Sequence, residues 1–273
     1  MDEKGSTGGK LVFLQLDLND LESVKVAART FAEKESKLDV LWNNAGGGGY
    51  RVKEGARTVQ GFEPMMGWHC IATLLFTTLL LPLLQAAANA ERERSGAFGG
   101  QTRVLWISSG MAETDTPKFG IDFDQLEGTN RIKNYAMSKA GVWFLGREFA
   151  RRYASDGILS LPVNPGNLKT NSWSGTPAPL MWVFNAVMLH DAIFGSYTAL
   201  YAGISPTLTM EHSGQHIIPW GRIHPDDEIK PRHDLLEAMK PVEEGGRGLA
   251  AKLWEWCQAK WQPWYIPPRE HGR

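Results

Sequence analysis

The sequence predicts an α/β fold with a parallel β-sheet, and three observations support this prediction. First, a short apolar run, an amphipathic stretch and a second apolar run follow one another within residues 11–42, the order of a strand–helix–strand unit. Second, two further apolar runs of strand length follow at 103–107 and 158–163. Third, all four runs end in polar or turn-forming residues, and such ends share one edge of a parallel sheet, where open α/β sheets bind ligands.

The amino-terminal unit begins with Leu11–Leu16, whose apolar composition predicts a buried strand. Apolar residues at helical spacing predict a helix that runs to about Lys34. Asn19, with Glu22 three residues later, resembles a capping box at the start of that helix. A second strand is predicted at Leu38–Trp42, and a glycine-rich loop follows it.

The later elements alternate in the same way within one expected domain, 1–273. The sequence next predicts an apolar helix over 70–90, a polar stretch over 91–102, a strand over 103–107 and a loop over 110–129. A helix that contains Tyr135 then runs to about Tyr153, and a strand follows over 158–163. The last predicted elements are a short helix over 197–204, a strand over 215–219 and an amphipathic helix over 249–261. We interpret 171–195 as a substrate lid or an ordinary core helix. Residues 245–273 are interpreted as a helical extension that packs against the domain or a second subunit, so a homo-oligomer is an expectation.

The stretch from Cys70 to Ala90 carries no charge and is long enough to span a membrane. Polar residues and Pro82 interrupt it, and no clear basic flank sets an orientation. A helix that is apolar on all sides is equally suited to burial inside a protein. We therefore favour burial and expect no membrane span.

The overall composition excludes several classes of partner. The 273-residue chain has a net charge of −1 with its charges interspersed, which argues against nucleic acid and anionic membrane surfaces. The two cysteines, Cys70 and Cys257, are too few for a disulfide framework, and the polar start lacks the apolar core of a signal peptide. We therefore expect a cytoplasmic protein. The seven histidines show no metal-ligand spacing, so the sequence predicts no metal.

Tyr135 and Lys139 stand four residues apart on a predicted helix and therefore share one face of it. A free tyrosine has a pKa of about 10, and a nearby ammonium group lowers it by favouring the phenolate. Together with a serine hydroxyl from Ser108 or Ser109 to hold a carbonyl oxygen, such a pair forms a general acid for carbonyl reduction. The same spacing also arises by chance on many helices.

These residues resemble the motifs of the short-chain dehydrogenase/reductase family, in the branch of retinol dehydrogenases and fungal biosynthetic reductases. Five stretches carry the resemblance in the family's order: LDLND around Asp17, NNAG at 43–46, SS at 108–109, YAMSK at 135–139 and NPGNLKT at 164–170. The resemblance covers almost the whole chain and implies a Rossmann-like doubly wound parallel sheet.

The resemblance also implies a role for each matching residue. Tyr135 matches the proton donor, and Lys139 matches the residue that lowers its pKa and holds the nicotinamide ribose. Ser109 matches the residue that orients the substrate carbonyl, and Ser108 is expected to support the end of the strand. For the cofactor, NADP or NAD, the implied contacts are Asp17 at the adenine edge, Asn44 beside the adenosine ribose, and Gly166, Leu168 and Thr170 at the nicotinamide end.

The chain departs from the family pattern at its amino-terminal part. The family begins with a strand, a glycine-rich turn and a helix that holds the pyrophosphate, whereas Asp17 falls on what should be the third strand. We therefore expect an amino-terminally truncated sheet whose first two strands are missing. The strand that ends at Asp17 must then pair directly with the strand that ends at Asn43, or detach and leave an open edge.

A second departure places His69 where the family has its catalytic asparagine. Two interpretations stay open. The histidine relays protons, since its ordinary pKa of about 6.5 suits that task, or the position has drifted. A shift of one residue in the alignment makes Trp68 or Cys70 the counterpart instead.

The leading functional hypothesis is an NAD(P)(H)-dependent oxidoreductase that acts on a carbonyl or alcohol of a lipophilic small molecule, such as one of a secondary-metabolite pathway. Eleven tryptophans and the apolar stretch at 171–195 suit such a substrate. One alternative is a non-redox isomerase, cyclase or dehydratase that uses Tyr135 and Lys139 as acid and base. Another is an inactive truncated partner protein.

Overall fold

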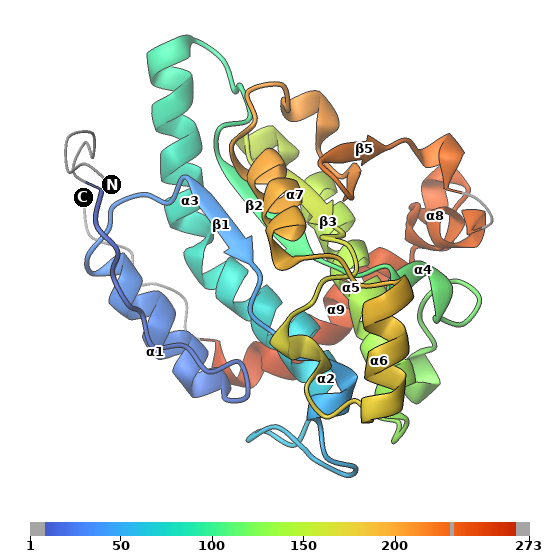
Figure 1. Cartoon of the computed structure of the whole chain (residues 1–273). Helices are drawn as coiled ribbons and strands as arrows, with labels where there is room; N and C mark the ends of the chain where they lie inside the picture. Colours follow the sequence, from blue (N-terminus) through green and yellow to red (C-terminus); the bar gives the residue numbers. More distant parts are fainter. Residues whose placement is uncertain (1–8, 230–231, 266–273) are drawn as a thin grey trace, which may run out of the picture.

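A computed structural model of the chain describes residues 9–229 and 232–265, and these residues form a five-stranded sheet packed between helices (Figure 1). The strands are β1 (Val40–Asn43), β2 (Arg103–Ile107), β3 (Leu159–Val163), β4 (His216–Ile218) and β5 (Arg222–His224). The helices are α1 (Leu21–Ala32), α2 (Pro64–Met66), α3 (Thr73–Ser95), α4 (Met111–Thr114), α5 (Arg131–Tyr153), α6 (Ala178–Val187), α7 (Ala192–Ile204), α8 (His233–Met239) and α9 (Leu249–Trp261). A π-helical segment, Gly67–Ala72, joins α2 to α3.

The sheet order is β1-β2-β3-β4-β5, with the first four strands parallel and β5 antiparallel to β4. Helices α3 and α5 return the chain between successive parallel strands, which is the arrangement that parallel pairing requires. The Rossmann-like α/β fold predicted from the sequence is therefore confirmed. The antiparallel strand β5 was not predicted.

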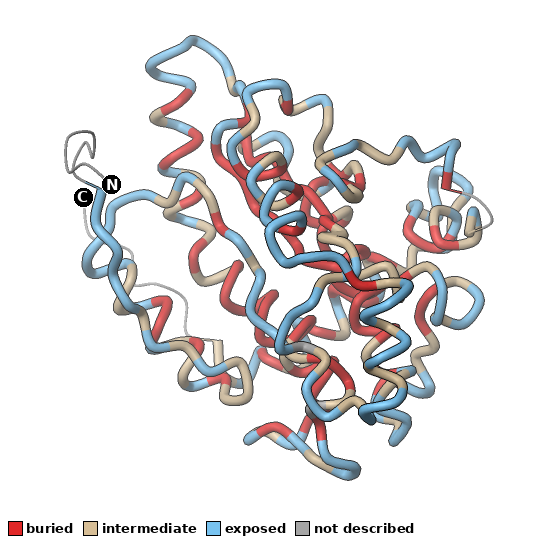
Figure 2. Tube along the Cα trace, viewed as in Figure 1, coloured by how far each residue is buried: buried red, intermediate tan, exposed pale blue. Residues whose placement is uncertain are grey.

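The two faces of the sheet are covered by different helices because neighbouring side chains of a strand point to opposite faces. In β2, Val104 and Trp106 join the larger core with α1, α3, α5, α8 and α9, while Leu105 and Ile107 join a smaller core beside α7. The buried residues in Figure 2 accordingly lie along the strands, α3 and α5.

Helix α5 lies very close to the sheet, and this closeness fixes the position of its side chains. A Cβ atom on Gly146 would meet Pro162 Cγ and Trp106 Cδ1 at 2.9 Å, so only glycine allows this approach. Across the same contact, Trp106 Nε1 donates to Ser160 Oγ at 2.9 Å, and Ser160 Oγ donates to Gly146 O at 2.7 Å. The helix begins at the Asn130 cap, whose side chain accepts from the backbone N–H groups of Ile132 and Lys133.

The predicted strand at Leu11–Leu16 is wrong. The structure assigns no strand to described residues before Val40, and Leu11, Val12 and Phe13 are more than two-thirds exposed. Leu14 and Leu16 rest against the larger core instead. A strand needs a neighbour to bond with, and β1 bonds only to β2, so the first of the two expected alternatives, direct pairing, does not occur.

The predicted capping box at Asn19 and Glu22 is also wrong. Asp20 caps α1 by accepting from Glu22 N at 3.0 Å, whereas Asn19 Oδ1 accepts from Trp68 Nε1 at 3.0 Å. The predicted loop over 110–129 contains the short helix α4. The difference at the cap arises because a tertiary partner, the Trp68 indole, competes for a side chain that the local pattern assigns to the cap.

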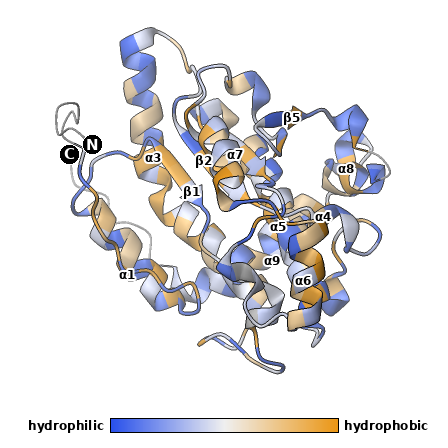
Figure 3. Ribbon diagram, viewed as in Figure 1, coloured by the Kyte–Doolittle hydropathy of each residue, from blue (hydrophilic) through white to orange (hydrophobic). Residues whose placement is uncertain are grey.

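The apolar segment predicted at 70–90 lies in a continuous helical stretch, Pro64–Ser95, that is long and apolar enough to cross a membrane by length and composition. Most of its apolar window is buried inside the fold, which agrees with the favoured interpretation as a core helix. By contrast, α6 and α7 are apolar but outward-facing, as comparison of Figures 2 and 3 shows. Trp182 and Val187 of α6 are exposed by 74% and 78%.

Candidate active site

Ser109, Tyr135 and Lys139 converge at the carboxyl end of β2. Ser109 is the second residue after the strand, and Tyr135 and Lys139 lie one turn apart on α5. Lys139 Nζ donates to Ile107 O at 2.9 Å, and Ser108 Oγ donates to Lys139 O at 2.7 Å. The second of these bonds gives Ser108 the supporting role expected of it, because it ties the end of β2 to α5.

The electrostatics of this group differ from the expectation for Tyr135. Burial raises the pKa of Tyr135 above its usual value, and a hydrogen bond with Ser109 opposes that rise. The Lys139 ammonium lies over the phenol ring, 5.8 Å from its centre. Burial also lowers the pKa of Lys139 to about 8. Burial is thus the larger influence on the pKa of Tyr135, and the hydrogen bond with Ser109 offsets part of it.

Two adjoining cavities meet at Tyr135. The first, of about 410 Å³, is mostly apolar and is lined by Gly48, Gly49, Tyr50, Ser109, Gly110, Met111, Thr114, Asp115, Ile132, Tyr135, Asn167, Trp173, Phe184 and Met188. The second, of about 570 Å³, is lined by Lys139, the glycines at 46–48, Trp42, Asn44, residues 107–109, residues 165–168, Thr170, Trp173 and part of α7. Ser109 and Tyr135 line both, so a group held in either cavity can reach the tyrosine hydroxyl.

Comparison with known proteins identifies the family to which the chain belongs. The short chain dehydrogenase family model matches residues 1–117. The chain is 43% identical to a short-chain dehydrogenase/reductase of Pestalotiopsis fici, over 94% of this chain and 74% of that protein. It is 40% identical to one of Neocamarosporium betae, over 92% of this chain and 71% of the relative. The chain belongs to the short-chain dehydrogenase/reductase family. It is thus an oxidoreductase by family.

Solved structures support the fold of this short-chain dehydrogenase/reductase. An uncharacterised protein from Mycobacterium paratuberculosis is 25% identical with a TM-score of 0.58, covering 90% of this chain and 74% of that one. The NADPH-bound carbonyl reductase from chicken fatty liver is 23% identical with a TM-score of 0.53, covering 78% and 76%. A 3-oxoacyl-[acyl-carrier protein] reductase from Brucella melitensis, solved with NAD, has a TM-score of 0.56 at 22% identity, covering 78% of both chains.

His69, the departure from the family pattern, has a defined place in this reductase-like site. Its Nε2 accepts from Gly47 N at 3.2 Å, so the ring proton belongs on Nδ1, which lies 2.8 Å from Ser138 Oγ. Ser138 Oγ in turn donates to Tyr135 O at 2.8 Å. Burial holds the pKa of His69 well below its usual value, with the charge of Lys139 as a second cause.

This arrangement favours a positioning role for His69 over a proton relay. Both ring nitrogens are engaged, and the ring is neutral at physiological pH. The ring also packs edge-on against Tyr135, with 5.9 Å between the ring centres. A Cβ atom on Gly46 would meet His69 Nε2 at 2.5 Å, which explains a glycine there. His69 thus links the loop after β1 to α5, the helix that carries Tyr135.

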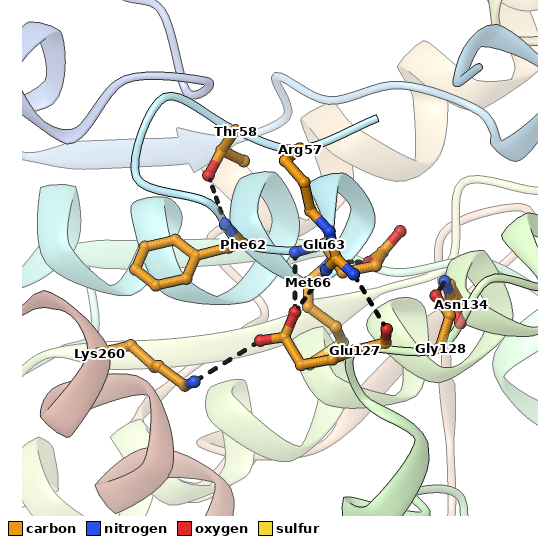
Figure 4. Close-up of polar contacts among 9 residues, drawn as sticks. All are labelled: Arg57, Thr58, Phe62, Glu63, Met66, Glu127, Gly128, Asn134 and Lys260. Atoms are coloured by element: carbon orange, nitrogen blue, oxygen red, sulfur yellow. Dashed lines mark hydrogen bonds and ion pairs between the residues drawn. The ribbon is translucent and has the colours of Figure 1, made fainter. Parts of the chain in front are cut away.

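A second set of polar contacts holds the start of α5 (Figure 4). Asn134, the residue before Tyr135, donates to Gly128 O at 2.7 Å. Asn134 also bonds to the buried carboxyl of Glu63, which caps α2. Burial raises the pKa of Glu63, and its hydrogen bonds from Met66, Met65 and Asn134 oppose the rise. Around this group, Glu127 accepts from Arg57 at 2.7 Å and lies 3.6 Å from Lys260 of α9. These contacts join three parts of the chain beside Tyr135.

The structure brings together most of the residues that the sequence singled out, but not Asp17. Asn44, Gly166, Leu168 and Thr170 line the second cavity with Lys139, whereas Asp17 does not line it. The Asp17 carboxylate instead accepts from Asn19 N at 2.9 Å in the turn before α1. Asp17 lies away from the second cavity because residues 11–16 do not pair with the sheet. No strand therefore places Asp17 at the edge of the sheet.

Several lining residues were not singled out from the sequence. Trp173, Phe184 and Met188 come from the segment interpreted as a lid, and Met111 and Ile132 come from α4 and α5. The apolar composition of 171–195 signalled the first three as a group. No local pattern distinguished Met111, which enters the wall because α4 starts two residues after Ser109.

Proposed function

We propose that this chain uses a nicotinamide dinucleotide, NADP or NAD, to reduce a carbonyl on a lipophilic small molecule or to oxidise the corresponding alcohol. The observation that carries the proposal is the position of Ser109 and Tyr135 at the junction of two cavities. One cavity has a mostly apolar wall, which includes Trp173 and Phe184, for a substrate. The other reaches Lys139 and the family's nicotinamide-binding residues.

The residues of the second cavity fit a nicotinamide ribose. Among the described residues, Ile107 O is the acceptor within hydrogen-bond distance of Lys139 Nζ, and an ammonium has three donors. The buried lysine therefore retains donors for hydroxyl oxygens. Asn44, Leu168, Thr170 and Tyr135 would hold the cofactor with it. When bound, the dinucleotide supplies or accepts the hydride.

The protein's own part is to hold the carbonyl and move one proton. Ser109 Oγ donates a hydrogen bond to the carbonyl oxygen, and the Tyr135 hydroxyl donates the proton to the same oxygen. The raised pKa of Tyr135 keeps it protonated at neutral pH, as a proton donor requires. Trp173 and Phe184 place aromatic side chains on the wall of the cavity in which the carbonyl would lie. The fungal relatives support a place among fungal biosynthetic reductases.

One observation favours a non-redox acid–base enzyme as the second candidate. Asp17, the implied contact for the adenine edge, lies outside the cavity, so this end of a dinucleotide loses an expected partner. An isomerase or dehydratase would need only Tyr135, Ser109 and Lys139.

The test is a fluorescence titration of the purified chain with NADPH and NADH, followed by turnover with a series of lipophilic ketones. We expect saturable micromolar binding of one dinucleotide. We also expect Tyr135→Phe to lower turnover by ~100-fold or more, the usual contribution of a general acid, while it keeps the dinucleotide affinity. Absence of binding at millimolar dinucleotide would overturn the redox proposal and leave the acid–base candidate.

A further inference from the structure

The hairpin formed by β4 and β5 places two histidines side by side. His216 and His224 are directly opposite each other in the antiparallel register, so their side chains project from the same face of the hairpin. Their ring centres are 6.3 Å apart. Because seven residues, including a turn, lie between them in sequence, no short motif signals the pair.

A carboxylate from another element faces this histidine pair. Glu113 belongs to α4, and its Oε1 lies 3.9 Å from His216 Nδ1. The three side chains can each offer one ligand atom, and these atoms all lie within 4.8 Å of one another. Arg232 Nη1 donates to Glu113 O at 2.6 Å and so fixes the backbone of α4 at this point.

The nitrogen atoms at this place lack the partners that buried polar atoms normally have. His216 is 1% exposed, and neither of its ring nitrogens has a hydrogen-bond partner among the described residues. The same holds for the buried Nδ1 of His224. Buried polar groups are usually satisfied, so these unpartnered nitrogens indicate a ligand that bonds to one nitrogen of each ring.

The surroundings hold the His216 ring in place. The ring stacks on Trp143 of α5, with ring centres 4.1 Å apart and planes inclined by 27°. This stacking fixes the orientation of the imidazole beside Glu113 and His224.

The nearest cations are already paired with carboxylates of their own. Arg147 makes two bonds to Asp226, at 2.6 and 3.1 Å, and Arg232 bonds to Asp234 at 2.8 Å. Neither arginine therefore neutralises the Glu113 carboxylate by a direct ion pair.

We propose that Glu113, His216 and His224 form a binding site for a divalent transition-metal ion of the Zn²⁺ type. Two imidazoles and one carboxylate are a ligand set that Zn²⁺ accepts, with water in the fourth position. Tetrahedral bonds of about 2.0–2.1 Å place ligand atoms roughly 3.3 Å apart, so the widest separation here must close by about 1.5 Å. The half-buried side chains of Glu113 and His224 can make this movement while His216 stays stacked on Trp143.

The site has a structural consequence for the reductase. Helix α4 presents Met111 and Thr114 to the first cavity and Glu113 to the histidines. A bound ion therefore braces one wall of the proposed substrate cavity against the β4–β5 hairpin. The proposal stands apart from dinucleotide binding, since none of the three ligands lines the second cavity. It departs from the sequence-based prediction of no metal.

The experiment is a calorimetric titration of the untagged, chelator-treated protein with Zn²⁺, together with the visible spectrum of the Co²⁺ form. We expect one ion per chain, Co²⁺ bands typical of a low-coordinate nitrogen–oxygen site, and a higher Tm with Zn²⁺ than without it. Removing a residue that hydrogen-bonds to a metal ligand typically lowers metal affinity ~10- to 100-fold. Removing a ligand should cost at least as much, so His224→Gln and Glu113→Gln should each lower the Zn²⁺ affinity by at least ~10-fold.

The matched control is His233→Gln, which changes an exposed histidine of α8 and should leave Zn²⁺ affinity and stoichiometry unchanged. Equal Tm values of the metal-free variants and the metal-free parent would show that folding is intact. Should a variant fail to fold, the stoichiometry and Co²⁺ spectrum of the parent decide. The proposal is overturned if the parent shows no saturable binding, or if His224→Gln binds Zn²⁺ as tightly as the parent does.

Discussion

Replacing Lys139 by methionine should abolish turnover and at the same time stabilise the protein. Lys139 is only 8% exposed, and its ammonium has Ile107 O at 2.9 Å as its acceptor among the described residues. Burial lowers the pKa of this lysine from 10.5 to about 8. The folded state therefore holds a charged group in a place that disfavours the charge.

The size of the effect follows from the pKa. Each pKa unit corresponds to about 1.4 kcal/mol, so a shift of about 2.5 units costs the folded state about 3 kcal/mol at pH 7. Methionine removes this cost but also removes the bond to Ile107 O, which contributes about 1 kcal/mol. The free energy of unfolding should therefore rise by about 2 kcal/mol, or about 4 °C in Tm for a chain of this size.

The sign of the pH dependence makes the prediction specific. The folded-state pKa lies below the unfolded value, so the unfolded chain binds more protons between about pH 8 and 10.5, and parent stability rises with pH across that window. The gain in free energy of unfolding from Lys139→Met is thus largest at pH 7 and nearly absent at pH 10. Thermal denaturation without dinucleotide measures it, with Lys133→Met, an exposed lysine of the same helix, as control. If Lys139→Met melts at or below the parent at pH 7, the burial argument is refuted.

Two further predictions concern the packing around the site. Ser160→Ala should lower the free energy of unfolding by about 2 kcal/mol, because it removes the Ser160 hydroxyl that bonds to Trp106 Nε1 and Gly146 O. Urea denaturation measures the change, with exposed Ser155→Ala as the control. An unchanged urea midpoint for Ser160→Ala would contradict the prediction. His69 has a folded-state pKa well below 6.5, so the unfolded chain alone takes up its proton and stability should fall by ~1.4 kcal/mol per pH unit below pH 6.5 from this residue. In urea denaturation at pH 5.5, 6.5 and 7.5, His69→Gln should reduce that slope; an identical slope would count against the buried neutral ring.

Elements whose burial is decided by their own residues could be predicted from the sequence. Strand β2 and helix α9 have the predicted bounds, Arg103–Ile107 and Leu249–Trp261. The strand is buried on both faces, so a continuous apolar run identifies it. Helix α9 repeats its apolar residues at helical spacing against α5, and that period is visible without any structure.

Elements that depend on a distant partner could not be predicted in this way. Residues 11–16 have strand composition, but a local pattern does not reveal whether an edge is available to pair with them. Strand β5 exists because a turn at 219–221 folds Arg222–His224 back onto β4. The pairing of His216 with His224 depends on that register, and their proximity to Glu113 depends on α4. The spacing of the histidines along the chain therefore does not reveal the cluster.

The candidate site follows the same division. The four-residue spacing of Tyr135 and Lys139 predicted their shared face correctly, because helix geometry alone decides it. The spacing did not predict their electrostatics, because burial raises the pKa of the tyrosine and lowers that of the lysine by desolvation, which depends on the packing of α5 against β2. Spacing therefore identifies which groups meet, whereas burial decides their protonation.

The hydrogen bonds that position Tyr135 lie in the part of the chain from β1 onward. The bonds from Gly47 through His69 and Ser138 to Tyr135 link the loop after β1 to α5, and Ser108 and Lys139 link β2 to the same helix. None of these bonds involves residues 9–39. The acid is thus positioned by the part of the sheet from β1 onward, whatever holds the adenosine end. For this reason the titration of dinucleotide affinity, rather than the geometry of Tyr135, separates the two proposed functions.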